Sequence, residues 1–226
     1  YYYDLLLMSK MAAILGNEND VADYFTLSEE VKAAYIKEFF NEDTKQFGSA
    51  SQASNAIPLF FDLVEPQYRD EVLQNLVADI KKHGNRLTTG DVGNRYLFQT
   101  LVNNDLNELM YLMNNHEDAP GYGFQVKFGA TTLTEQWDPR EGTSWNHFMM
   151  GQIDEWFFAS LAGIKPDPDR PGFKEFIIDP QVVGDMNFVS ASTKTLYGKI
   201  SVDWKREGAQ FILNISVPAN SSAKVI

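Results

Sequence analysis

The chain has 226 residues, an apolar fraction of 44% and a net charge of −12. This length and apolar content predict one large folded domain, or one domain with part of another, rather than a disordered chain. The acidic charge argues against a nucleic-acid partner, and the absence of cysteine excludes disulfides, thiolate nucleophiles and Cys-ligated metal sites.

The first part of the chain, residues 1–164, has the pattern of successive helices. A first helix is expected to end at Gly16–Asn17, and Thr26–Glu29 has the form of a capping box that would start the second helix. Pro66 favours the start of another helix, along which apolar residues recur in one stripe, and His83–Gly84 favours its end.

Three further helices are expected before the helical pattern ends. Two cover 94–102 and 105–114. The clearest covers 145–161 and would place His147 in its first turn, because apolar residues recur there at helical spacing. These residues are Trp145, Phe148, Met149, Ile153, Trp156, Phe157 and Leu161. No apolar run approaches the roughly 18 residues that a membrane-spanning helix needs, so no membrane partner is expected.

The pattern changes after Gly163. Residues 165–172 hold three prolines and are predicted to form a linker. Polar residues then alternate with apolar ones, as at Ile200, Val202 and Trp204, which is typical of half-buried antiparallel strands. The charge balance also changes, with 6 Lys/Arg and 5 Asp/Glu from Phe173 onward against 13 and 26 before it. Five strands are expected, over 173–178, 186–193, 198–205, 210–217 and 223–226.

These elements indicate a mainly α protein with a C-terminal β unit. We interpret residues 1–164 as part of an (α/α)6 toroid, residues 165–172 as a linker and residues 173–226 as an antiparallel β-sandwich. Whether the β-sandwich is complete stays open. A helical bundle or a solenoid would show the same periodicity, so both stay open. Tyr1 has no Met before it and lies in a mid-helix pattern, so the chain is expected to be a piece of a longer protein.

The richest chemistry lies in the loop that holds Glu135, Trp137 and Asp138. Glu135 is either a solvated surface charge or a general base, which needs an oriented and partly desolvated carboxylate. Trp137 is either a packing residue or a flat platform for a sugar ring. Asp138 precedes a proline, so it is either a turn-former or a ligand for a sugar hydroxyl.

His147 lies off the apolar stripe of the helix predicted over 145–161. In a first turn it would feel the positive end of the helix dipole, which favours a neutral imidazole able to bind a substrate hydroxyl. An exposed surface histidine is the alternative. Because Glu135, Trp137 and His147 lie within 13 residues of one another, we expect them to line one cleft. The segment Gly90–Arg95 is interpreted as a plain helix start capped by Asp91, with presentation of its backbone to a ligand as the less favoured reading. Asp167–Gly172 resembles a calcium loop only faintly, because Ile178 stands where a bidentate Glu is needed.

Four segments of the chain resemble the bacterial α-L-rhamnosidase family of glycoside hydrolases. They are Gly129–Asp138, Ser144–His147, Pro171–Gln181 and Tyr197–Trp204. The resemblance implies the C-terminal part of the catalytic toroid followed by the C-terminal β-sandwich. It also implies that Glu135 is the general base, that His147 contacts the bound sugar, and that Trp137 helps to position it.

The resemblance further implies an inverting enzyme that cleaves terminal α-L-rhamnosides without a metal or an organic cofactor. Inversion needs two carboxyl groups roughly 6.5–9.5 Å apart with water beside the base. The family segment that supplies the general acid is absent from this chain, so the chain alone is expected to be inactive. The family usually has Trp before the catalytic glutamate, whereas this chain has Thr134.

Other functions stay open at this point. The protein could hydrolyse another neutral or deoxy sugar, as Thr134 suggests, or be a non-catalytic helical scaffold or carbohydrate-binding protein. The expected partner is a rhamnose-containing glycoside or polysaccharide. The oligomeric state and the compartment are left undetermined, and a periplasmic or extracellular location is compatible with the function.

Overall fold

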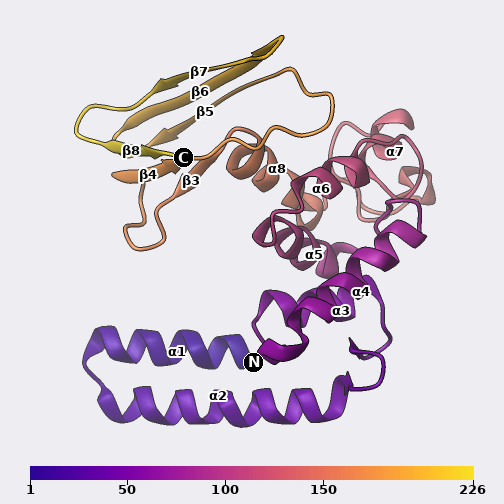
Figure 1. Ribbon diagram of the computed structural model, residues 1–226, viewed down its shortest axis with the longest axis vertical. Helices are drawn as coiled ribbons and strands as arrows, with labels where there is room; N and C mark the ends of the chain where they lie inside the picture. The colour runs from indigo at the N-terminus through magenta and orange to yellow at the C-terminus, as the bar shows by residue number, and fades with distance from the viewer. The chain divides into compact units, whose positions relative to one another are not determined.

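The computed structural model describes residues 1–226 and divides into two compact units, Tyr1–Thr89 and Gly90–Ile226. The first unit is helical, whereas the second contains helices and both larger sheets (Figure 1). No helix in the chain combines the length and apolar character that crossing a membrane requires.

The first unit begins with a hairpin of two antiparallel helices, α1 (Tyr2–Leu15) and α2 (Glu18–Phe39), drawn in indigo and violet in Figure 1. Gly16 ends α1 as predicted. Its left-handed backbone (φ 75°, ψ 20°) lets its N–H reach the carbonyl oxygens of Ala12 and Ala13.

The predicted helix start at Thr26–Glu29 is wrong. These four residues lie inside α2, where the Ser28 hydroxyl donates to the Phe25 carbonyl oxygen at 2.7 Å. The helix begins instead at Glu18, and the acidic side chains of Glu18 and Asp20 suit the positive end of the helix dipole there.

The rest of the first unit consists of a short strand pair and a second pair of helices that contact each other. Val72, Leu76 and Ile80 are fully buried along one face of α4, which confirms the apolar stripe predicted after Pro66. His83 follows the last residue of α4, also as predicted. The elements are β1 (Phe40–Asn41), β2 (Gln46–Phe47), α3 (Gln52–Phe60), η1 (Pro66–Tyr68) and α4 (Arg69–Lys82).

The helices of the second unit begin with α5 and α6, which contact each other and lie close to their predicted positions. They are α5 (Asp91–Asn103), α6 (Asn107–Asn114), α7 (Tyr122–Lys127), η2 (Pro139–Glu141), η3 (Phe148–Met150), α8 (Gln152–Trp156) and η4 (Phe157–Leu161), the last with π-helical geometry. The short helix α7 was not predicted.

The single helix predicted over 145–161 is wrong in its first part. Residues 145–147 are irregular and are followed by one 3-10 turn, η3, before α8 begins at Gln152. Backbone pairing holds this start in place: His147 N–H donates to the Leu133 carbonyl oxygen at 3.0 Å. His147 therefore lies outside any α-helical first turn, and the helix-dipole argument does not apply to it.

All five predicted β runs form strands, and with one further strand they make two three-stranded sheets (Figure 1). One sheet is an antiparallel meander of β5 (Phe188–Thr195), β6 (Gly198–Glu207) and β7 (Gln210–Ser216). The other has the order β3-β4-β8, with β4 parallel to β8, a pairing that alternation alone does not specify. Its strands are β3 (Ile164–Pro166), β4 (Glu175–Ile178) and β8 (Ser222–Val225).

The linker predicted over 165–172 is wrong at its start. Lys165 and Pro166 belong to β3 and pair with Ile177 and Phe176 of β4, and the remaining residues form the turn between these strands. Gly163 precedes β3 with φ 75°, and a Cβ there would lie 2.3 Å from the Asp179 carbonyl carbon.

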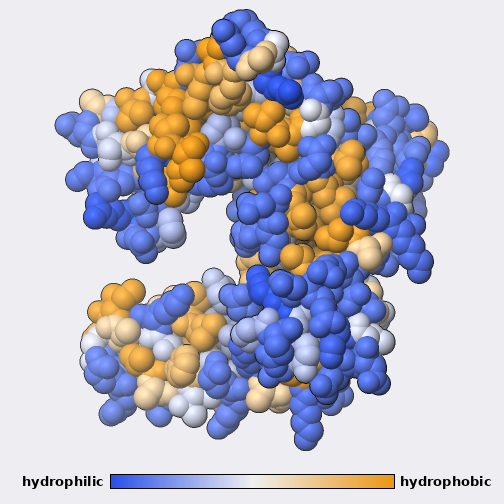
Figure 2. Space-filling model, viewed as in Figure 1, coloured by the Kyte–Doolittle hydropathy of each residue, from blue (hydrophilic) through white to orange (hydrophobic).

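The core of the β unit lies between the two sheets. Ile200, Val202 and Trp204 of β6 are buried against residues of β3 and β4, which confirms the apolar face predicted from alternation. Both units also expose large hydrophobic side chains, visible as orange areas in Figure 2. Exposed apolar faces of this kind are typical of surfaces that bind other molecules or chain segments.

Candidate active site

Two loop segments form the frame of the candidate site, and backbone hydrogen bonds join them in antiparallel fashion. Glu135 N–H donates to the Ser144 carbonyl oxygen at 2.9 Å, and His147 N–H donates to the Leu133 carbonyl oxygen at 3.0 Å. The Thr132 hydroxyl also donates to the Trp145 carbonyl oxygen. The chain thus places the segments of Glu135 and His147 side by side, although twelve positions separate the two residues.

Glu135 is exposed, and the structure fixes one of its carboxylate oxygens. Ser144 N–H donates to Oε2 at 3.3 Å, whereas Oε1 has no hydrogen bond within the chain. The preceding Thr134 is fully buried, and its hydroxyl donates to the Gln136 carbonyl oxygen at 2.6 Å. The desolvation expected for Glu135 is therefore absent, while its orientation by a hydrogen bond is present.

Trp137 is partly buried against α7. Its ring meets that of Tyr122 edge-on, with centroids 5.1 Å apart and planes at 87°. Tyr122 is itself anchored, since its hydroxyl donates to the Met150 carbonyl oxygen at 2.7 Å and accepts from Asn94 Nδ2 at 3.1 Å. Burial raises the pKa of Tyr122, so its hydroxyl stays protonated. The contact supports the packing role of Trp137, and a role as a sugar platform stays a prediction.

Asp138 forms a turn in this structure. Its Oδ1 accepts from the backbone N–H of Arg140 at 3.0 Å, and its carboxylate binds the Arg140 guanidinium through two bonds of 2.8 and 2.7 Å. The guanidinium holds the pKa of Asp138 at about 2. Arg140 also lies 4.1 Å above the ring of Phe128, the residue that directly follows α7, so the pair holds the loop against the end of that helix. Sugar binding by Asp138 stays a prediction.

His147 pairs with a residue of α5. Its Nε2 lies 3.1 Å from Oδ2 of Asp91, and both side chains are partly buried. The hydrogen bond from His147, followed by that from the Val92 N–H, lowers the pKa of Asp91. The prediction that Asp91 caps α5 is wrong: Gly90 occupies the N-cap position, no side chain caps the helix, and Asp91 is its first residue.

The sequence analysis missed two features near the site. It did not predict that Asp91 pairs with His147, and it did not name Gln152 as a site residue. Gln152 Nε2 donates to the Asp91 carbonyl oxygen at 3.3 Å. Asn94 Nδ2 reaches Gln152 Oε1 at 3.4 Å. Asp91 and His147 are 56 positions apart, so no local pattern reports their contact. The only local sign that Asp91 has a role in the site was its position as an acidic residue directly after the glycine that precedes α5.

A hollow of about 350 Å³ lies beside this pair. Asp91 lines it from α5, and Phe148 and Met149 line it directly after His147; Phe148 is 84% exposed. Glu135 and Trp137 are not among the lining residues, so a single cleft shared by Glu135, Trp137 and His147 stays a prediction. The remaining lining residues are Val92, Arg95, Tyr96 and Gln152.

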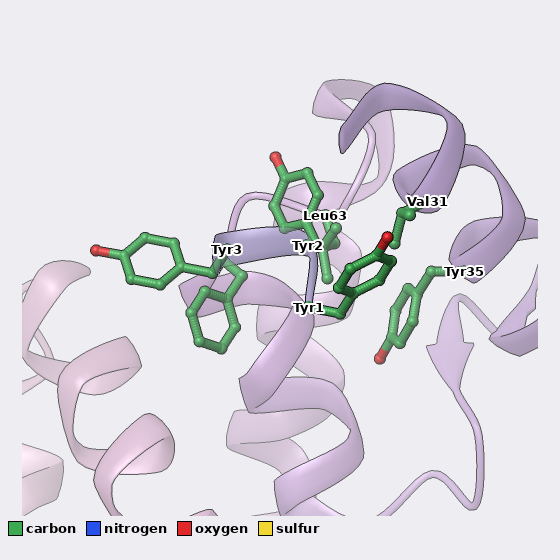
Figure 3. Close-up of a pocket in the computed structure, with 7 residues that line it drawn as sticks. Tyr1, Tyr2, Tyr3, Val31, Tyr35 and Leu63 are labelled. Carbon is green, nitrogen blue, oxygen red and sulfur yellow. The ribbon is translucent and has the colours of Figure 1, made fainter. Parts of the chain in front are cut away.

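The first unit has a different kind of hollow, of about 270 Å³, shown in Figure 3. Tyr1, Val31 and Tyr35 line it, and so do Tyr3 and Phe61, whose ring centroids lie 5.1 Å apart. The ring of Tyr3 points away from the other three. No carboxylate or imidazole lines this hollow, so it lacks the groups that acid–base chemistry on a sugar needs.

In the second unit two stacked sheets follow the helices, and a carboxylate, an indole and an imidazole lie on the loops between helices. Residues 1–161 match the bacterial alpha-L-rhamnosidase 6 hairpin glycosidase domain, and residues 163–226 match the bacterial alpha-L-rhamnosidase C-terminal domain. The chain belongs to the bacterial α-L-rhamnosidase family.

Individual relatives agree with this assignment. An α-L-rhamnosidase from Alteromonas sp. is 31% identical over 97% of this chain, and one from Streptomyces avermitilis is 29% identical over 97%. The chain spans about a quarter of the length of these curated relatives, 25% and 22% respectively.

Solved structures show the same fold. The α-L-rhamnosidase of Dictyoglumus thermophilum superposes with a TM-score of 0.91 at 35% identity, covering 99% of this chain and 26% of that one. The Streptomyces avermitilis enzyme, solved in complex with L-rhamnose, superposes with a TM-score of 0.89 at 28% identity, covering 99% and 22%.

Proposed function

We propose that this chain is the C-terminal part of an inverting glycoside hydrolase that cleaves terminal α-L-rhamnosides, with Glu135 as the general base. Family membership over nearly the whole chain supports the reaction class. The relative from Streptomyces avermitilis binds L-rhamnose, which supports the sugar. The chain covers only about a quarter of the relatives' length, which supports the proposal that a longer protein supplies the rest of the site.

The state of the Glu135 carboxylate carries the proposal. A general base must hold a lone pair toward a water molecule while its own position is fixed. Ser144 N–H fixes Oε2, and Oε1 faces no donor in the chain, so one oxygen orients the group and the other is open to water. The exposed setting admits the water that inversion consumes. The partial desolvation that a general base also needs is absent from these residues, and the proposal assigns it to the bound sugar and to the rest of the longer protein.

The proposed reaction needs two carboxyl groups on opposite sides of the sugar. Glu135 takes a proton from water as the water oxygen attacks the anomeric carbon. A carboxylic acid elsewhere in the protein protonates the glycosidic oxygen as its bond to that carbon breaks. His147 and Trp137 hold the sugar ring. No metal or organic cofactor takes part in this proposal.

A second candidate function is hydrolysis of another neutral or deoxy sugar by the same fold. Thr134 favours it, because this buried residue cannot present the aromatic wall that the family's usual Trp would offer. A panel of nitrophenyl glycosides, assayed with the intact protein that carries this chain, separates the two. Turnover of α-L-rhamnoside well above all other sugars supports the first function, and a different preferred sugar supports the second.

The decisive variant is Glu135→Gln, compared with Glu141→Gln as a matched control. Glu141 lies six positions away in the same loop, is exposed, and makes no hydrogen bond with its carboxylate. We expect kcat to fall about 10²–10⁴-fold for Glu135→Gln only, because the amide cannot accept the proton. Equal activity of the two variants would show that Glu135 has no catalytic role, which is the expectation if this chain is a non-catalytic scaffold. Release of the β-anomer, observed by NMR at early times, tests inversion.

A further inference from the structure

The pair of Asp91 and His147 connects the first residue of α5 to the loop that precedes η3. Asp91 Oδ2 and His147 Nε2 lie 3.1 Å apart, with 35% and 23% of the two side chains exposed. Asp91 lines the hollow of about 350 Å³ that Phe148 and Met149 also line. The pair therefore lies at the edge of a space that a ligand can enter.

Asp91 is itself held from both sides. Its Oδ1 accepts from the Val92 N–H at 2.8 Å, and its carbonyl oxygen accepts from Gln152 Nε2 at 3.3 Å. The bonds to its carboxylate lower the pKa of Asp91, so the group is ionised at neutral pH. Both carboxylate oxygens are in use, and an ionised carboxylate can only accept hydrogen bonds.

This geometry decides which nitrogen of His147 carries the proton. Because the partner of Nε2 can only accept, Nε2 must be the donor, and Nδ1 of the neutral ring is then an acceptor. Nδ1 of His147 makes no hydrogen bond within the chain. The ring thus offers one fixed acceptor that the folded chain leaves unused.

We propose that Asp91 is a positioning residue, which fixes the ring orientation and the Nε2–H tautomer of His147 so that Nδ1 accepts a hydrogen bond from a sugar hydroxyl. The part that concerns the sugar rests on the proposed function. The tautomer itself follows from the Asp91 contact alone. A carboxylate that orients an imidazole in this way is a general device of protein sites.

His83 provides an internal reference for the test. Its Nδ1 lies 2.8 Å from the Asp79 carbonyl oxygen, which can only accept, so His83 must carry its proton on Nδ1. The chain has three histidines, so the ring signals can be assigned by single substitutions. The two residues should therefore show opposite tautomers in one spectrum.

The first experiment measures nitrogen chemical shifts of ¹⁵N-histidine-labelled protein, at a pH where the rings are neutral. We expect the Nε2–H form for His147 and the Nδ1–H form for His83. In Asp91→Asn the side-chain amide has only one oxygen to accept from both the Val92 N–H and His147 Nε2. If that oxygen accepts from Val92, the amide NH₂ faces Nε2, which must then accept, so His147 shifts toward the Nδ1–H form. Asp23→Asn removes an exposed carboxylate of α2 and should leave the His147 tautomer unchanged.

The second experiment measures kinetics of the intact protein. Asp91→Asn should lower kcat/KM for the rhamnoside about tenfold or more, because a charge-assisted hydrogen bond is lost. The same change in a His147→Ala background should have little further effect, because Asp91 acts through His147. Additive losses would assign Asp91 a role independent of His147 and overturn the proposal.

The outcomes separate this inference from the proposed function. An Nδ1–H tautomer of His147 in the wild type, or an unchanged tautomer in Asp91→Asn, overturns the positioning role whatever the activity. An active Glu135→Gln protein overturns the proposed function and leaves the tautomer result intact. If Asp91→Asn does not fold, an Nδ1–H form of His147 in the wild-type spectrum still overturns the positioning role.

Discussion

The indole N–H of Trp204 donates to the Leu161 carbonyl oxygen at 2.7 Å, which links strand β6 to the end of the helical segment η4. Trp204 is 2% exposed, so this bond is shielded from water. The oxygen that it satisfies lies where the helical pattern ends and the β unit begins. The bond is one of several that connect the β unit to the helices within the second unit.

Trp204→Phe should therefore destabilise the protein by about 1–3 kcal/mol, because it leaves the buried Leu161 carbonyl oxygen without a donor. Trp145→Phe is the matched control. Trp145 also donates its N–H to a carbonyl oxygen, that of Pro139, but the residue is 41% exposed and water can replace the bond. Urea denaturation measures both effects, and equal losses would contradict the argument.

Gly163→Ala should be more destabilising than Gly208→Ala. Both glycines have positive φ, 75° and 60°, so both substitutions carry the backbone cost of about 1–2 kcal/mol for a left-handed residue. At Gly163 the new Cβ would also lie 2.3 Å from backbone atoms of Asp179 and Pro180, whereas nothing lies within 4 Å at Gly208. Thermal unfolding of the two variants should differ clearly; similar midpoints would rule out the close approach.

The pair of Asp138 and Arg140 predicts a pH effect. The pKa of Asp138 lies at about 2, below the ordinary 3.8, because Arg140 binds the charged form. Since the folded-state value is the lower one, the pair stabilises the fold above about pH 4, and this contribution disappears as the pH falls through about 2. An NMR titration should return the Asp138 pKa toward 3.8 in Arg140→Gln. An unchanged low value would show that another group sets it.

Azide provides a test of what Glu135 does in the proposed reaction. Azide attacks the anomeric carbon without giving up a proton, so it needs no general base. It should partly restore turnover of an activated rhamnoside by Glu135→Gln, with a glycosyl azide as product. Failure of azide to restore any turnover would indicate that Glu135 has a role beyond proton transfer.

Residues 1–226 alone should not hydrolyse an α-L-rhamnoside, while the intact protein should. An inverting reaction needs a second carboxyl group, and the proposed function places it outside these residues. A nitrophenyl assay of the isolated chain measures this, with circular dichroism as the control for folding. Hydrolysis by the isolated chain at a rate near that of the intact protein would assign the general acid to these 226 residues.

Local pattern was sufficient for most elements of this protein. The turn at Gly16, the buried stripe of α4 and all five β runs were predicted because each depends on neighbouring residues with a fixed period of burial. The helix predicted over 145–161 has the right spacing, but its first residues bond to the loop near Glu135 instead of to each other.

The candidate site divides in the same way. The sequence alone determined its residue types, since Glu135, Trp137, Asp138 and His147 lie close together in one segment that resembles a known family. Only the tertiary structure decided their partners: Asp138 binds Arg140, Trp137 packs on Tyr122, and His147 pairs with Asp91, 56 positions away. A hydrogen bond between distant residues depends on how the chain folds back, and no periodicity in the sequence records that distance.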